Sequence, residues 1–415
     1  MTWSHNAVFC AYLALVAGGC AQSNLGPAQP ATASISSKPG AAPEAAHEAN
    51  KAKAVKIALI LPLGGYGEPA QIARGMKQAA EMALFEADNP AVQLIVKDDA
   101  GTPQGAMAAA DAAITEGAEI ILGPLFAKSA TAIAPIANKA SVPVISFSND
   151  PVAAGHGVYL MSFLASDEVN RVVGYAASQG KRRFAALIPA TAYGAAIEPA
   201  FRNAVAKSGG QIAALETYST DATSMLTSAK KLVQAISKAE KLGSPIDALF
   251  VPAGQETISQ LGPLLTYSGL TSTNLKLLGT SAWDVSIISR DDALIGGWYA
   301  ASDPAGWTAF ATKYRKNFGT EPPRLATLSY DAMTMALTLA ASAGPTRFSA
   351  GKLTRTEGFS GTDGTVRLTA SGFSQRQLAV LEIQKYGSAV IDAPAPDAAA
   401  QPQAMAISPA VRPQL

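Results

Sequence analysis

The chain has 415 residues and a formal net charge of +1 at pH 7, so it is nearly neutral. A chain of this length can form two domains with separate cores. Its weak charge gives no electrostatic reason to expect nucleic-acid binding. Both cysteines and two of the three histidines precede the predicted folded region; they are Cys10, Cys20, His5 and His47. This distribution predicts no disulfide, metal site or cofactor held by such side chains in the folded body.

Residues 1–20 have the pattern of a signal peptide that ends in a lipidated cysteine. The apolar run at residues 7–16 is too short to predict a membrane-spanning helix. It is followed by Ala17-Gly18-Gly19-Cys20, which resembles a bacterial lipoprotein box with Cys20 as the acylated residue. Ala21 after the cysteine favours sorting to the outer membrane. The alternative is an ordinary secretory signal in which Cys20 has no role.

Two further segments, residues 21–54 and 387–415, are rich in Ala and Pro and poor in large apolar side chains. Such a composition cannot bury enough apolar surface to offset the entropy of ordering the chain. We therefore predict a disordered linker of residues 21–54 and a disordered tail of residues 387–415.

Strands and helices alternate strictly through the first part of the folded region. Apolar runs at Val55–Leu61 and residues 92–97, 120–122 and 142–145 predict buried strands, with helices between them. This order predicts a parallel α/β sheet, and ligands bind outside the carboxyl ends of such strands. The candidate ligand contacts in these turns are Tyr66, Leu125, Phe126, Lys128, Ser146 and Ser148. The turn at residues 64–67 lacks the spacing of a nucleotide-binding loop.

The same alternation starts again at Asp167, with strands predicted at residues 184–188, 212–218, 246–251 and 275–278. The turns after these strands supply the candidate contacts Tyr193, Gln255, Ser281, Trp283 and Asp284, of which Trp283 is the preferred one.

The later segments predict a chain that passes repeatedly between two lobes. We expect residues 55–165 and 297–345 to form lobe 1, and residues 166–296 and 346–386 to form lobe 2. The crossings between the lobes are expected near residues 163–166, 296–298 and 344–349.

No catalytic set is visible in the sequence. Within Asp98-Asp99 and Asp291-Asp292 the adjacent side chains diverge, so neither pair forms an acid/base dyad by spacing alone. His156 lies in a loop segment and is expected to be exposed there. The sequence therefore predicts a protein that is not an enzyme.

Three motifs resemble those of the leucine-type periplasmic binding proteins. They are Gly123-Pro124 after the third strand, Pro-Val-Ile-Ser at residues 143–146, and Tyr330-Asp331-Ala332 in a late helix. The resemblance covers about residues 55–385. It implies a type I fold with two α/β lobes, each a mostly parallel sheet flanked by helices, joined by three crossings. It also implies a periplasmic location and a ligand held between the lobes.

Longer motifs are similar to those of the penicillin-binding-protein activator lipoproteins. These are ILGPLF at residues 121–126, IDALFVPAG at 246–254, LLGTSAWD at 277–284 and LIGGWYAASDP at 294–304. This resemblance implies a lipid-anchored regulator of peptidoglycan synthesis whose partner is a cell-wall synthase. The helical-repeat domain of the longer activators is not expected here, because residues 21–54 are too few for it.

The alternative function is a solute-binding receptor of an ABC importer for amino acids or a similar small polar solute. In amino-acid-binding members, a serine follows the third-strand turn and an acid follows the ninth strand. Here Ala127 and Lys128 occupy the first place, and Ser281 stands near the second. Ser148 is retained after the fourth strand, but Asp150 follows it and would repel an anion. Only part of the family's amino-acid clamp is therefore present.

Overall fold

The computed structural model describes residues 54–270, 275–285, 288–342 and 344–394. The predicted signal peptide, Cys20 and nearly all of the predicted linker lie outside the described residues. No helix within the described ranges is long and apolar enough to cross a membrane.

The first sheet contains five parallel strands in the order β2-β1-β3-β4-β5. The strands are β1 (Val55–Leu61), β2 (Val92–Asp98), β3 (Ile120–Leu122), β4 (Val144–Ser146) and β5 (Val158–Leu160). A short 3-10 turn, η1 (Pro151–Ala153), precedes β5. The sheet is the parallel arrangement that the strand–helix alternation predicts.

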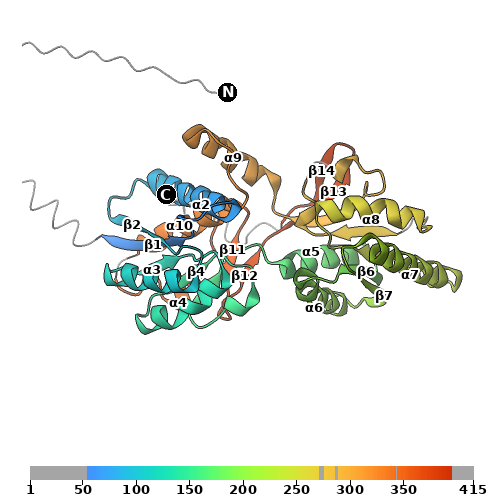
Figure 1. Ribbon diagram of the computed structural model, residues 1–415, viewed down its shortest axis with the longest axis horizontal. Coiled ribbons are helices and arrows are strands. Elements are labelled where there is room, and N and C mark those ends of the chain that lie inside the picture. Colours follow the sequence, from blue (N-terminus) through green and yellow to red (C-terminus); the bar gives the residue numbers. More distant parts are fainter. Residues whose placement is uncertain (1–53, 271–274, 286–287, 343, 395–415) are drawn as a thin grey trace, which may run out of the picture. The chain divides into compact units, whose positions relative to one another are not determined.

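Helices cover both faces of the first sheet (Figure 1). Ile57, Leu59 and Leu61 of β1 pack with α2 and α10, whereas Ala58 and Ile60 pack with α3 and α4. Successive side chains of a strand point to opposite faces, so a continuous apolar strand is buried on both sides. The covering helices are α2 (Glu68–Ala87), α3 (Pro103–Thr115), α4 (Ala127–Lys139) and α10 (Ala326–Ala340).

The second sheet contains seven strands in the order β14-β13-β10-β9-β8-β6-β7. β13 and β14 are antiparallel to their neighbours, and the other pairs are parallel. The strands are β6 (Arg183–Pro189), β7 (Gln211–Tyr218), β8 (Ala248–Phe250), β9 (Lys276–Gly279), β10 (Trp298–Ala301), β13 (Ala379–Gln384) and β14 (Gly387–Asp392).

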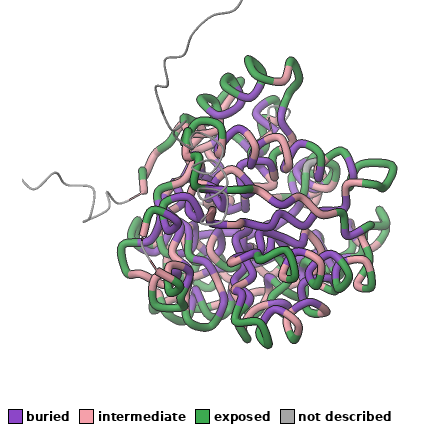
Figure 2. Tube along the Cα trace, turned by 90° about the vertical axis from the view of Figure 1, so that its left-hand side faces the viewer, coloured by how far each residue is buried: buried purple, intermediate pink, exposed green. Residues whose placement is uncertain are grey.

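The second sheet is also covered on both faces. Apolar side chains of α7 and α8 pack with one face, and those of α5 and α6 pack with the other. The helices are α5 (Ala165–Ser178), α6 (Ala192–Lys207), α7 (Ala222–Lys241) and α8 (Gln255–Tyr267). Two 3-10 turns, η2 (Ser281–Trp283) and η3 (Ile288–Arg290), follow β9. Figure 2 shows that buried residues concentrate along the strands, while outward helix faces are exposed.

Local capping fixes where several helices begin. The side chains of Thr102, Thr191 and Asp221 accept hydrogen bonds from backbone N–H groups in the first turns of α3, α6 and α7. Asp303 does the same for α9. These bonds satisfy N–H groups that have no partner within the helix, so the sequence sets these starts without tertiary contacts.

Four later elements complete the first core. The aromatic side chains of Phe310 and Tyr314 on α9 pack against Met82 of α2. Leu353, Val366 and Leu368 join the core around β1. The elements are α9 (Pro304–Phe318), α11 (Ala350–Leu353), β11 (Val366–Leu368) and β12 (Ser374–Arg376).

The chain passes between the lobes three times, as predicted. The first crossing lies between the end of β5 at Leu160 and the start of α5 at Ala165, so it overlaps the predicted residues 163–166. The second crossing follows Ala301, because β10 pairs with β9 and β13 and thus belongs to the second sheet. The predicted crossing at residues 296–298 and the lobe boundary at residue 297 are therefore too early. An apolar strand signals burial but does not say which sheet it will join.

The third crossing follows Arg376 rather than residues 344–349. Phe348, Leu353 and Phe359 are buried in the first core, and β11 pairs with β12 in a small separate sheet. Residues 346–376 thus pack with the first lobe, and the predicted boundary at residue 346 is also too early. The apolar side chains were visible in the sequence, but their partners were not.

The tail prediction is wrong at its start. β14 pairs with β13 from Gly387 to Asp392, within the segment predicted as disordered. Arg171 of α5 holds this edge: its Nε donates to Leu378 O at 2.7 Å, and its Nη2 donates to Asp392 Oδ2 at 2.8 Å. Composition cannot show that a neighbouring strand supplies backbone partners. Residues 395–415 lie outside the described residues.

Candidate ligand-binding site

Two adjoining cavities lie beside the crossings. One has a volume of about 610 Å³ and the other of about 500 Å³. They share three lining residues, Phe163, Glu168 and Ser281. Cavities of this size are typical of small-molecule sites.

Glu168 is the buried carboxylate between the two cavities. It lies in the first turn of α5 and is only 6 % exposed. Its Oε2 accepts a hydrogen bond from the Ser281 backbone N–H at 2.9 Å, and its Oε1 accepts one from the Ser281 hydroxyl at 2.7 Å. Burial raises the pKa of Glu168 to about 7, although the bonds from Ser281 favour the charged form. A cationic ligand group would stabilise the ionised carboxylate here.

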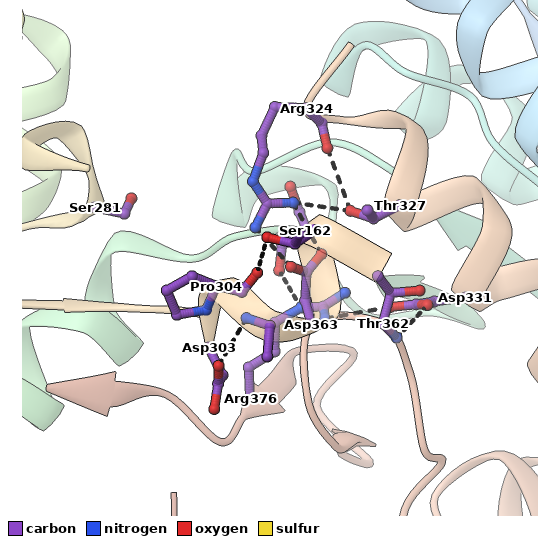
Figure 3. A network of polar contacts seen from close by, with 12 residues as sticks. Ser162, Ser281, Asp303, Pro304, Arg324, Thr327, Asp331, Thr362, Asp363 and Arg376 are labelled. Carbon is purple, nitrogen blue, oxygen red and sulfur yellow. Dashed lines mark hydrogen bonds and ion pairs between the residues drawn. The ribbon is translucent and has the colours of Figure 1, made fainter. Parts of the chain in front are cut away.

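Arg324, which lies between α9 and α10, lines the second cavity with Glu168. Figure 3 shows Arg324 beside Asp363 and Thr327. Its Nη2 and Nη1 donate to the two oxygens of Asp363 at 2.6 and 3.0 Å. Its guanidinium lies 4.6 Å from the ring centroid of Phe163 and 4.9 Å from that of Trp307. Its side chain remains 41 % exposed, so the cation is accessible to a ligand.

The charge of Arg324 acts on both nearby acids. Burial would raise the pKa of Asp363, but the hydrogen bonds and charge of Arg324 hold it below its ordinary value. The same guanidinium lowers the pKa of Glu168, although burial prevails there. One cavity is thus lined by an exposed cation and a buried acid that interact electrostatically.

Other polar groups line the walls. The Tyr193 hydroxyl is 3.1 Å from Thr280 Oγ1, and burial raises the pKa of Tyr193 to about 12, so this phenol stays neutral. Asp284 Oδ1 accepts a hydrogen bond from the Tyr299 hydroxyl at 3.0 Å. Asp150 lines the first cavity and caps η1.

The structure brings three of the predicted second-lobe residues to the cavities: Tyr193, Ser281 and Asp284. Trp283 lies in the second core instead and is 1 % exposed. The turn η2 directs the indole under β9, where a Cβ on Gly279 would come within 2.2 Å of it. Trp283 is therefore a packing residue, which corrects its preferred role as a ligand contact. The side chain of Gln255 lies outside the described residues.

The predicted first-lobe residues line neither of these two cavities. Tyr66 and Lys128 are exposed, and Leu125 and Phe126 are half-buried. Ser146 and Ser148 are buried and bond to neighbouring backbone: the Ser146 hydroxyl donates to Pro124 O at 3.0 Å, and the Ser148 hydroxyl accepts from Asp150 N at 3.1 Å. These residues remain candidates only through their place in the turns after the strands.

Sequence reasoning missed Glu168, Arg324 and Phe163. Glu168 lies in the first turn of α5, where acids are common for reasons of helix stability, so its position carries no binding signal. Arg324 follows two prolines before a helix, and this pattern carries no binding signal. The three residues come together only through contacts between distant segments. Within the part of the chain that the structure describes, no cluster of His, Cys, Asp or Glu could hold a metal ion.

Two α/β lobes joined by three crossings, with cavities beside those crossings, define the fold of a two-lobed periplasmic binding protein. A family model described as "Periplasmic binding protein" matches residues 54–388. The chain therefore belongs to the periplasmic binding protein family, and its fold is the type I, leucine-binding-protein-like form.

A curated relative is an uncharacterized protein of Rickettsia prowazekii (strain Madrid E). It is 24 % identical over 166 residues, a match that spans 40 % of this chain and 44 % of that protein. The chain thus matches less than half the length of this relative.

Solved structures show the same fold over most of the chain. A protein of Rhodospirillum rubrum, provisionally described as a branched-chain amino acid ABC transporter, has a TM-score of 0.70 at 20 % identity, covering 81 % of this chain and 100 % of that one. A substrate-binding protein of Desulfitobacterium hafniense in complex with Leu has a TM-score of 0.57 at 17 % identity, covering 81 % and 99 %. A solute-binding protein of Rhodopseudomonas palustris BisB5 in complex with 3,4-dihydroxybenzoic acid has a TM-score of 0.55 at 19 % identity, covering 84 % and 99 %.

Proposed function

We propose that this protein is a solute-binding receptor of an ABC importer, which takes an amino acid or a similar small polar solute at the two cavities. The observation that carries the proposal is that Glu168 and Arg324 line one cavity at the crossings. The family membership and the transporter proteins among the structural neighbours support the same class. The signal-peptide pattern supports a location in the periplasm, with the receptor attached to the outer membrane through a lipid on Cys20.

An amino acid carries one group for each of these side chains. A guanidinium binds a carboxylate through paired N–H donors, and Arg324 uses three of its five N–H groups in hydrogen bonds to described residues. The Glu168 carboxylate attracts an ammonium group, which would repay part of the cost of its burial. Phe163 and Trp307 offer apolar walls for the rest of the solute.

Glu168 can also replace the acid that the sequence lacks among the amino-acid-binding residues of the family. Ser281 stands near the place where amino-acid-binding members have an acid. The two hydrogen bonds from Ser281 bring the carboxylate of Glu168 to this same place from α5. A different segment thus supplies the acid that the sequence comparison misses. Closure of the lobes around the solute would be a hinge motion at the crossings.

The proposal is tested by differential scanning fluorimetry and calorimetry of residues 54–394 with the common amino acids. A ligand that binds only the folded state raises the melting temperature, so at least one solute should produce a concentration-dependent rise. Arg324→Lys keeps a cation beside Asp363 but loses the paired N–H donors of the guanidinium. It should weaken binding of the solute about tenfold or more. Arg315→Lys, on an exposed pair with Glu321, is the matched control and should bind as the parent does.

The result that would overturn the receptor function is the absence of any ligand-induced shift across amino acids and related polar solutes. The activator function rests on the motif resemblance alone. Stimulation of a peptidoglycan synthase by the purified protein, without a bound solute, would support that function in place of the receptor.

A further inference from the structure

The two cavities adjoin but differ in the charge of their walls. The first is lined by the acids Asp150 and Glu168, and its described lining includes no lysine or arginine. The second contains the cation Arg324 beside Glu168 and Asp284. A cationic group is favoured in the first cavity, and the carboxylate-binding group lies in the second.

Few residues separate the two cavities, and most of them are polar. This boundary consists of Phe163, Glu168 and Ser281, the three residues common to both linings. Tyr193 in the first cavity and Ser302 in the second add hydroxyl groups on either side. Such groups suit a solute whose middle carries amide donors and acceptors, because buried polar groups need hydrogen-bond partners.

We infer that the solute is a short peptide with free ends, whose amino terminus lies by Asp150 and Glu168 and whose carboxylate lies by Arg324. This inference rests on the proposed receptor function and names its substrate class. A single α-amino acid carries both charged groups on one carbon, so it can meet Glu168 and Arg324 in the second cavity but does not reach Asp150 in the first. A peptide separates the charges and places amide groups across the shared boundary. The alanines of the first cavity, Ala165, Ala192 and Ala196, leave room for a side chain there.

Calorimetry of the full-length protein with leucine, alanyl-leucine and alanyl-alanyl-leucine tests the inference. At least one of the two peptides should bind ten times more tightly than leucine, because it fills both cavities. An N-acetylated and a C-amidated form of that peptide should each lose at least tenfold in affinity.

Two variants assign the ends. Arg324→Lys should weaken the free peptide about tenfold but leave the C-amidated form nearly unchanged. Asp150→Asn should weaken the free peptide but not the N-acetylated form, and asparagine retains the cap of η1. Asp221→Asn makes the same change at the cap of α7, away from both cavities, and should have no effect on affinity.

The outcomes separate the inference from the function. Leucine binding as tightly as the peptides, or blocked peptides binding as tightly as free ones, would overturn the peptide inference and leave the receptor function intact. A lack of binding by every amino acid and peptide would overturn both.

Discussion

At the scale of single residues, the defining feature is a carboxylate kept away from water. Glu168 has a pKa of about 7, against an ordinary value of 4.5, and burial is the main cause. Burial also raises the pKa of the neighbouring Asp167, to about 6. An acid whose pKa is higher in the folded than in the unfolded state binds more protons when folded, at pH values between the two pKa values. The free energy of unfolding therefore falls as the pH rises through that range.

We predict that Glu168→Gln flattens this pH dependence. The stability that the parent gains from the neutral acid is complete below pH 4.5 and is lost as the pH rises through about 7. The variant never ionises, so at pH 8 it should be more stable than the parent by up to about 3 kcal/mol. Chemical denaturation at several pH values measures this difference.

The matched control for this prediction is Glu198→Gln on α6, where the acid is partly exposed and pairs with Arg202. It should change stability by less than about 0.5 kcal/mol at any of these pH values. Equal pH profiles of the parent and Glu168→Gln would contradict the buried-acid assignment.

At the scale of elements, β14 is the edge strand of the second sheet, next to β13. The residues that it pairs run from Val380 to Gln384 on the partner strand. Without β14, the backbone groups of β13 would form an exposed edge, which can pair with another chain. β14 therefore protects a long antiparallel edge as well as adding cross-strand contacts.

We predict that truncation after Tyr386 lowers stability by about 1 to 3 kcal/mol, since each cross-strand pair contributes about 0.2 to 1 kcal/mol. It also removes Asp392, the partner of Arg171. Size-exclusion chromatography should show self-association of the truncated protein. Truncation after Pro394, which keeps β14, is the control and should leave melting temperature and elution volume unchanged. A monomeric and fully stable short form would show that β14 contributes little.

At the scale of the whole molecule, one arginine links the first and third crossings (Figure 3). Arg376 precedes the third crossing, and its Nε donates to Ser162 O of the first crossing at 3.3 Å. Its backbone N–H donates to Asp167 Oδ2 at 3.3 Å. Its Nη1 lies 3.6 Å from Asp331 Oδ2 on α10, and both side chains are 1 % exposed. Asp331 also accepts from Thr362 N at 2.7 Å.

We predict that Arg376→Met destabilises the protein by about 3 to 5 kcal/mol, because it leaves the buried Asp331 without its counter-charge. Adding Asp331→Asn should recover a substantial part of the loss, so the two changes should not be additive. Equilibrium unfolding of both single variants and the double variant measures the coupling. Arg315→Met, at an exposed pair, should cost less than about 1 kcal/mol. Additive losses would rule out a direct pair.

The Asp331 pair also gives a physical meaning to a family marker. Tyr330-Asp331-Ala332 pointed to the fold by resemblance, and the structure shows that Asp331 is a buried partner of Arg376 rather than a cavity residue. Burial raises the pKa of Asp331 to about 6, while the Arg376 charge opposes the rise. The motif thus marks a structural site beside the crossings.

The sequence alone determined the two α/β lobes and the number of crossings. Strand and helix periodicities, helix caps and apolar runs are local, so the alternation could be predicted from neighbouring residues. The sequence also predicted ligand contacts in the turn after β9, and Ser281 and Asp284 of that turn line the second cavity.

Only the tertiary structure decided which sheet β10 joins, that β14 is a strand, and which side chains face the cavities. Glu168, Ser281 and Arg324 lie on segments far apart in the chain, and hydrogen bonds and packing between those segments bring them together. Trp283 shows the reverse, since a residue in a predicted cleft turn is buried beneath its own strand. The physical reason is that a local pattern fixes which side chains are apolar or charged, whereas strand pairing and core packing fix which distant groups they meet.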